Sequence, residues 1–363
     1  MSALARRRSW LRDRLGVRVP LVQAPMAGGP TTVDLVAAVA EAGALGSLAA
    51  ALLPPERIVE DAAAIRARTD RPFAINLFVL GHPTIDEAAV ARSLELLAPV
   101  REELGLVPGV LPERVQEPFD GQLAALLEAA PAVVSFTFGI LDADEVEELK
   151  EAGCVVVGTA TTPDEAIAWE GVGADAVVAQ GAEAGAHRGT FLAPVERSLV
   201  GLAALVPRIV DVVRIPVLAA GGIMDGRGVA AALALGADAA VLGTAFLGCP
   251  EAGVSDTWRA SLRAATGEDT TLTRGFTGRH ARAIRNDLLE LLAPHEADLP
   301  AYPVQGALTA DIRRAAAAAG RREYVNLWAG QGVGMLRELP AAELVRVLVD
   351  ETDAAIRALA GPV

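Results

Sequence analysis

The sequence predicts an α/β protein built on a (β/α)8 TIM barrel, and three observations lead there. Short apolar runs with β-branched residues alternate with helical patterns, giving eight strands within residues 1–245. Four phrases, EAGALGSL, EAGCVVVG, GVGADAVV and ALGADAAV, each place a glycine at a helix end just before a strand. No G-x-G-x-x-G follows the first strand, which argues against a doubly wound open sheet, the structural alternative.

The predicted strands are near-continuous apolar runs, as expected for parallel strands that are covered on both faces. In chain order they span Val17–Ala24, Leu45–Ala49, Phe73–Phe78, Val133–Phe136, Cys154–Gly158, Ala176–Gln180, Val217–Ala220 and Ala239–Leu242.

Helices are expected where apolar residues recur at helical spacing between these strands. Thr31 or Thr32 should cap the first of them, and Gly43 should end it. The basic N-terminal stretch, residues 1–16, predicts a short amphipathic helix and lacks the apolar run of a signal peptide. The helices expected further on span Thr32–Ala42, Pro55–Arg68, Ala143–Ala152, Pro163–Gly171, Gly226–Leu235 and Pro340–Ala360.

Two stretches exceed a minimal barrel, so we divide the chain into three parts. Residues 1–245 are expected to form the barrel, with an insertion after strand three at about 79–130 that is helical and extended around Pro108–Pro118. Residues 246–340 predict a helical and loop subdomain over the barrel mouth, and residues 341–363 a C-terminal helix. The insertion and the C-terminal extension together would build a smaller lobe.

The composition limits the classes of binding partner that the protein is expected to have. The net charge of −14 and the isoelectric point of about 4.8 argue against nucleic acid or an anionic membrane as the main partner. The two cysteines, Cys154 and Cys249, lie far apart without metal-type spacing, which suits a reducing cytoplasm. No apolar run is long enough to span a bilayer, and alanine-rich helices and buried strands explain the mean hydropathy of +0.36.

Glycines at the ends of the last two strands predict a phosphate site. Gly221 and Gly222 open the loop after strand seven, and Gly243 and Thr244 follow strand eight. Glycines allow backbone N–H groups to approach an anion, and these two loops are the usual phosphate site of the fold. The plainer interpretation is that these glycines only serve tight turns.

Polar side chains at other strand ends suggest a flat heterocycle in the barrel mouth. Asn76 lies in FAINLF and Gln180 ends AVVAQ, and buried amides need partners. A flavin ring offers carbonyl and N–H groups to such amides, although structural capping of a neighbouring strand is the alternative. After strand one, QAPMAGG would place its backbone along a ring edge at Pro25 and pack Met26 on the ring face.

His187 is the candidate catalytic residue. It lies seven residues beyond Gln180, in a loop of small residues, and imidazole is the usual general base near neutral pH. Glu183 and Arg188 are candidates to orient the imidazole. The alternative interpretation is that His187 is a histidine of a surface loop without a catalytic role. His82, His280 and His295 lack such a context, and no short spacing supports a metal site. Neither a G-x-S-x-G elbow nor a Walker A loop is present.

Together these phrases resemble the nitronate monooxygenase family, formerly called 2-nitropropane dioxygenases. The matching phrases are QAPMAGG, INLF, AQGAEAGAHRG, IPVLAAGGI, LGTAF and NLWAGQG, in the expected order over most of the chain. The AQG-x-EAG-x-HRG phrase is similar to the class I group. The family usually has Gly-Gly before the histidine, whereas this chain has Gly185-Ala186. Alanine is unfavourable there if residue 186 needs a positive φ.

The resemblance implies an FMN-bound enzyme that oxidises alkyl nitronates, such as propionate 3-nitronate, with O2 to a carbonyl compound and nitrite. By position, His187 matches the catalytic histidine. The implied FMN contacts are the backbone at Pro25–Met26 and the positions Asn76, Gln180, Gly185, Gly222, Gly243 and Thr244. A homodimer is a further hypothesis.

Three alternatives remain at this stage. One is a flavin-dependent enoyl-thioester reductase, whose barrels carry a similar EAG-x-H phrase and which would consume NAD(P)H. The others are a related enzyme acting on another stabilised carbanion, and a flavin-binding protein with an inactive site. The basic phrase Thr273–Asn286 is either a cover over the cofactor phosphate or a solvated helix.

Overall fold

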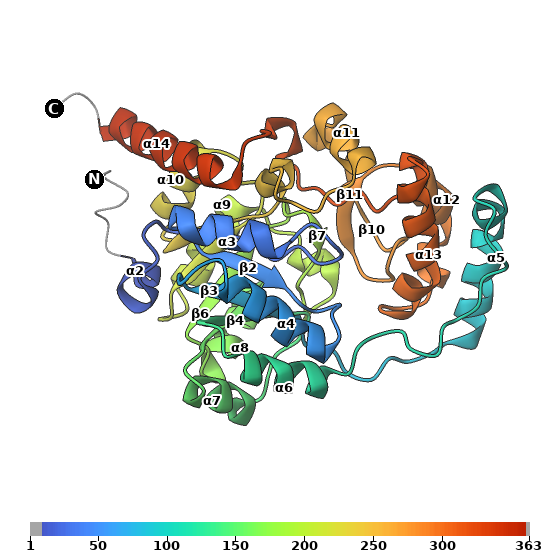
Figure 1. Ribbon diagram of the computed structural model, residues 1–363, viewed down its shortest axis with the longest axis horizontal. Coiled ribbons are helices and arrows are strands. Elements are labelled where there is room, and N and C mark those ends of the chain that lie inside the picture. The colour runs from blue at the N-terminus through green and yellow to red at the C-terminus, as the bar shows by residue number, and fades with distance from the viewer. Residues whose placement is uncertain (1–8, 361–363) are drawn as a thin grey trace.

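The computed structural model describes residues 9–360 and confirms the (β/α)8 barrel. Figure 1 shows the barrel beside a smaller lobe built from later segments and from α5 (Glu87–Glu103) of the insertion. All pairings in the eight-stranded sheet are parallel, in the order β1-β9-β8-β6-β5-β4-β3-β2. The strands are β1 Leu21–Gln23, β2 Gly46–Ala49, β3 Phe73–Phe78, β4 Val133–Thr137, β5 Val155–Ala160, β6 Ala176–Gln180, β8 Val217–Ala220 and β9 Ala239–Leu242.

The barrel closes between its first two strands through a short contact. The N–H of Gln23 donates to the Leu45 carbonyl at 2.9 Å, and the N–H of Leu45 donates to the Leu21 carbonyl at 2.9 Å. The predicted first strand was too long, because residues 17–20 lie outside β1. The other strands agree with their predictions to within two residues at each end.

Helices surround the barrel and begin where the sequence offers capping groups. The Thr32 hydroxyl accepts from the Leu35 N–H at 3.0 Å, and Gly43, with φ 95°, ends that helix. Asp142 and Glu145 form a capping box at a later helix. These outer helices are α3 Val33–Ala42, α4 Pro55–Arg66, α7 Ala143–Glu151, α8 Pro163–Gly171, α9 Leu202–Val210 and α10 Gly226–Ala234.

The C-terminal helix completes the outer ring of the barrel. Helix α14 (Ala341–Ala360) packs against α10 and α3, the helices that follow the seventh and the first barrel strands. It therefore takes the place expected of a helix after strand eight. In the insertion, α6 (Phe119–Ala129) packs against α4 in the same ring. The domain boundaries drawn from the sequence stay predictions.

The first helix of the insertion leaves the barrel for the lobe. Helix α5 (Glu87–Glu103) packs on α13 (Val304–Ala318), at the far edge of the molecule in Figure 1. Arg101 forms two hydrogen bonds to the Asp311 carboxylate, at 3.0 and 2.6 Å. The remaining lobe elements are α11 Asp256–Ala264, β10 Thr270–Thr273, β11 Ala281–Ile284 and α12 Asp287–Leu292.

The basic phrase that the sequence left open is part of the lobe. Its end forms β11, which pairs with β10 on one side and with β7 (Ala186–His187) on the other. It is therefore not a solvated helix, and its role as a cover over the cofactor phosphate stays a prediction. At the N-terminus the described part of the predicted helix is α2 (Trp10–Leu15), and residues 1–8 lie outside the described residues. Among the described helices, none combines the length and hydropathy that crossing a membrane would require.

Candidate active site

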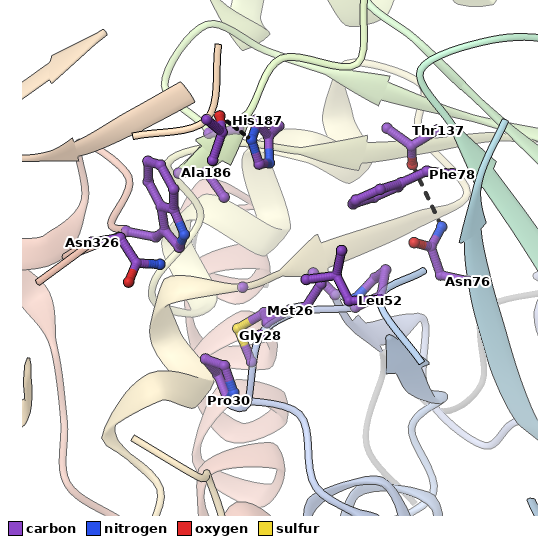
Figure 2. Close-up of a pocket in the computed structure, with 18 of the residues that line it drawn as sticks. Met26, Gly28, Pro30, Leu52, Asn76, Phe78, Thr137, Ala186, His187 and Asn326 are labelled. Atoms are coloured by element: carbon purple, nitrogen blue, oxygen red, sulfur yellow. Dashed lines mark hydrogen bonds between the residues drawn. The ribbon is translucent and has the colours of Figure 1, made fainter. Parts of the chain in front are cut away.

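A cavity of about 520 Å3 lies at the carboxyl ends of the barrel strands, under the lobe. Figure 2 shows Met26, Gly28 and Pro30 on one side of it, Asn76 and Phe78 on another, and Ala186 and His187 facing them. The cavity brings together nearly all the site residues predicted from the sequence: Pro25, Met26, Asn76, Gln180, Gly185, His187, Gly221, Gly222, Gly243 and Thr244.

The glycines after β8 and β9 leave donors available for an anion. Gly221 and Gly222 have φ values of 129° and 69°, a region that favours glycine. Among the described residues, no protein group accepts a hydrogen bond from the N–H of Gly222 or Gly243. Unpaired N–H groups beside a cavity fit the terminal phosphate of a flavin nucleotide.

Asn76 presents an acceptor to the cavity. Its Nδ2 group donates to the Ser135 carbonyl and the Ser135 hydroxyl, each at 3.0 Å, and the side chain is 3% exposed. Both amide hydrogens thus face β4, and Figure 2 shows the amide oxygen turned away from Thr137. The oxygen can accept a hydrogen bond from a ring N–H, which suits a flavin pyrimidine edge.

The side-chain amide of Gln180 holds the segment that carries His187, residues 181–189. Nε2 donates to the His187 carbonyl at 3.0 Å, and Oε1 accepts from the Gly189 N–H at 2.9 Å. The amide therefore ties the segment back to the end of β6. Gln180 lines the cavity, and this structural role accompanies the predicted flavin contact.

His187 lies on a strand, although the sequence places it in a loop. The two residues of β7 pair with β11, with Ala281 opposite His187. The loop interpretation was wrong because the partner strand is supplied by the lobe, far along the chain. Pairing to a strand fixes the backbone that carries the imidazole.

The imidazole of His187 sits among aromatic rings and two cations. Nε2 lies 2.8 Å from the Thr277 hydroxyl, and Phe138, Tyr302 and Trp328 have ring centroids within 5.3–5.6 Å. Burial, followed by the positive charges of Arg279 and Arg313, lowers the pKa of His187 to about 3. The imidazole is therefore neutral near pH 7 and has a nitrogen that can accept a proton.

The alanine that departs from the family pattern occupies a glycine-like conformation. Ala186 has φ 58°, in the left-handed region. Residue 186 therefore has the positive φ at which the sequence analysis expects alanine to be unfavourable, and an L side chain there is strained by about 1–2 kcal/mol. Pairing of Ala186 with Arg282 on β11 holds the backbone in this conformation.

Gly185 is needed for close packing against the segment NLWAGQG. A Cβ at position 185 would lie 2.5 Å from the Gly330 nitrogen and 2.6 Å from the Ala329 carbonyl carbon. Beside it, the Gln331 N–H donates to the Glu183 carbonyl at 2.9 Å. The resemblance implies an FMN contact at Gly185, and the structure shows that this glycine also packs against a protein backbone.

Glu183 and Arg188 do not orient the imidazole. The Glu183 carboxylate accepts from the Leu202 N–H at 2.9 Å, at the start of α9. The Arg188 guanidinium, 1% exposed, donates to the carbonyls of Gly181, Gln180 and Ser198 at 2.6, 3.0 and 2.9 Å. Arg188 thus holds the end of β6 and the residues near Ser198 together, and it acts on His187 only through the backbone.

Other predicted contacts carry local structural roles. The Met26 N–H donates to the Thr31 hydroxyl at 2.9 Å, which folds the turn after β1. The Thr244 hydroxyl accepts from the Gly330 N–H at 2.9 Å and so joins the end of β9 to NLWAGQG. Both residues still line the cavity.

The lobe contributes cavity residues that the sequence analysis missed. Trp328 lies in the phrase NLWAGQG and Thr277 in the basic phrase, so the sequence analysis included both segments but did not predict that these two side chains line the cavity. Tyr302 and Arg313 had no recognisable signal, because a tyrosine before a helix and an arginine on it are ordinary residues. Burial raises the pKa of Tyr302 to about 12, so its hydroxyl keeps its proton.

Comparison with known proteins decides the family. The family model described as nitronate monooxygenase matches residues 9–351. The chain belongs to the nitronate monooxygenase family. A probable nitronate monooxygenase of Staphylococcus aureus (strain JH9) is 39% identical over 342 residues, which cover 94% of this chain and 96% of the relative. The family and its neighbours are flavin-dependent oxidoreductases, so the cavity is that of a flavin enzyme.

Two solved structures extend this likeness to three dimensions. Nitroalkane oxidase from Streptomyces ansochromogenes has a TM-score of 0.89 and 43% identity, covering 96% of this chain and 99% of its own. FabK from Thermotoga maritima has a TM-score of 0.77 and 28% identity, covering 98% and 99%. The likeness covers both the barrel and the lobe.

Proposed function

We propose that the protein is an FMN-dependent nitronate monooxygenase that converts alkyl nitronates and O2 to carbonyl compounds and nitrite, with His187 as the general base. The observation that carries this proposal is the position of a neutral, half-buried imidazole on the wall of the cavity at the strand ends. General-base catalysis needs an unprotonated group beside the reacting carbon.

The donor set of the cavity fits FMN. The N–H groups of Gly222 and Gly243 would hold the phosphate, and the Asn76 oxygen would accept from the pyrimidine edge of the ring. Met26 and the backbone at Pro25 would line the ring. When bound, the flavin accepts electrons from the nitronate and passes them to O2.

The residues around His187 explain how it would handle a nitro compound. The imidazole would take the α-proton of a neutral nitroalkane, or donate a hydrogen bond to a nitronate that arrives as an anion. Thr277, 2.8 Å from Nε2, fixes the ring orientation. Arg279 and Arg313 depress the pKa of the imidazole, and an anionic nitronate would offset their charge and make the protonated ring less costly.

The test is oxygen uptake by the purified protein on propionate 3-nitronate, with and without NADH, after an absorbance spectrum has established the flavin. We expect uptake and nitrite formation that do not need NADH. Oxidation of NADH coupled to a 2-enoyl thioester, without nitronate turnover, would instead support the enoyl-thioester reductase. A protein that gains no visible flavin band on addition of FMN would contradict both enzyme assignments.

A further inference from the structure

One face of α13 forms the lobe side of the cavity. Tyr302 stands just before the helix, and Gly306, Ala310 and Arg313 follow at spacings of three and four residues. The two small residues leave open space between the phenol and the guanidinium. Ala310 is exposed, so this face reaches from the His187 ring to the mouth of the cavity.

Arg313 is a cation without a carboxylate partner in the described chain. Its guanidinium donates only to carbonyls of its own helix, from Nη2 to Gly306 at 2.9 Å and from Nε to Thr309 at 3.4 Å. The nearby Asp311 carboxylate is taken by Arg101, 2.6 Å away. Burial lowers the pKa of Arg313 to about 10, which still leaves it charged at neutral pH.

Arg313 is half-buried, and a cation withdrawn from bulk water that meets only neutral carbonyls is stabilised when an anion joins it. Nη1 of Arg313 donates to no group of the described residues, and the side chain lines the cavity. Arg313 lacks a carboxylate partner in the part of the chain that the structure describes, although the chain has a net charge of −14 and carboxylates are abundant elsewhere in it. The cavity wall thus offers a fork of donors to a planar anion.

The position of Arg313 argues for an anion other than the reacting group. Thr277, Tyr302 and Trp328 contact the His187 ring, whereas Arg313 forms no hydrogen bond to it. The guanidinium also belongs to the lobe wall, and the phosphate donors Gly222 and Gly243 belong to the barrel strand ends. The charge of Arg313 is near enough to lower the pKa of His187, so a nitronate held at the imidazole can meet the guanidinium through a second anionic group on its carbon chain.

We propose that Arg313 determines substrate specificity by binding a carboxylate carried by the nitronate at the end remote from its nitro group. Tyr302, whose hydroxyl has no hydrogen-bond partner among the described residues, can donate to the same carboxylate. The inference rests on the proposed function for the identity of the reacting group, and on the cavity wall alone for the anion site.

The test compares propionate 3-nitronate with propyl-1-nitronate, which has the same three carbons and lacks the carboxylate. We expect Arg313→Met to lower the ratio of their kcat/KM values by about 10- to 100-fold, the value of one charge-assisted hydrogen-bonded pair. Arg313→Lys should keep part of the preference. Arg314→Met, a change at the exposed neighbouring arginine, is the matched control and should leave the ratio unchanged.

A second readout separates this inference from the proposed function. Calorimetric titration with 3-nitropropionate and with 1-nitropropane in the absence of O2 measures binding without sustained turnover. Tighter binding of 3-nitropropionate that Arg313→Met abolishes supports the anion site even if no nitronate is oxidised. Equal losses for both nitronates, no difference in binding between the wild type and Arg313→Met, or loss of the flavin band in Arg313→Met would overturn the proposal.

Discussion

Replacing Gly185 by alanine tests how the histidine segment is held against the lobe. The added Cβ would lie 2.5 and 2.6 Å from backbone atoms of Gly330 and Ala329, nearly an ångström inside a normal contact. Backbone cannot rotate away as a side chain can, so NLWAGQG must shift. Gly185 does not have a positive φ, so the effect is purely steric.

The size of the effect follows from the contacts that would be lost. Overpacking costs about 1–3 kcal/mol. The shift would also break the hydrogen bonds from Gly330 to Thr244 and from Gln331 to Glu183, each 2.9 Å long and worth about 1 kcal/mol. We therefore expect the free energy of unfolding to fall by about 3–5 kcal/mol, together with weaker flavin retention.

Urea denaturation of the purified protein, followed by circular dichroism, measures this loss. Gly171→Ala is the matched control, because a Cβ there meets nothing within 4 Å and position 171 ends α8. That change should be neutral or stabilise by up to about 1 kcal/mol. If Gly185→Ala stays within about 1 kcal/mol of the wild type, the packing described for NLWAGQG is wrong.

Three further predictions concern the same segment. Ala186→Gly should raise the free energy of unfolding by about 1 kcal/mol, because φ 58° strains alanine; an unchanged value would contradict this. Arg188→Met should lower it by about 3–5 kcal/mol, because three carbonyls lose their donor, whereas Arg197→Met at an exposed position should not. In the folded protein His187 has a pKa of about 3, below its ordinary value of 6.5, so the unfolded state takes up the proton first and stability falls as the pH falls from 6.5 towards 3. His187→Asn should remove this pH-dependent contribution to the free energy of unfolding. On acidification from pH 6.5 to about 4, the variant should therefore lose about 2–3 kcal/mol less stability than the wild type. Equal acid sensitivity of the two proteins would refute the lowered pKa of His187.

The barrel and most of its mouth could be predicted because the signals are local. Apolar runs, several of them preceded by a glycine that ends a helix, identified the strands, and the geometry of a parallel barrel then placed Asn76, Gly222 and Gly243 together. Capping by Thr32 and the glycine stop at Gly43 were readable for the same reason. These features depend on neighbouring residues, which a sequence displays directly.

The lobe could not be placed because its contacts join distant parts of the chain. The pattern of α5 indicates a helix, but nothing local shows that Arg101 pairs with Asp311 across the lobe. His187 was taken for a loop residue because its strand partner, Ala281, lies in another segment. Arg313 was missed because an arginine on a helix is ordinarily solvated, and only the fold reveals that it is half-buried in the cavity wall.

The most direct test of the central claim compares His187→Asn with the wild type on two forms of one substrate. Neutral nitroethane needs a base to remove its α-proton, whereas ethyl nitronate arrives already deprotonated. We expect the variant to retain its flavin band and ethyl nitronate oxidation at a reduced rate, and to lose nitroethane oxidation by at least about 100-fold. Oxidation of nitroethane by His187→Asn at the wild-type rate would contradict the assignment of His187 as the base.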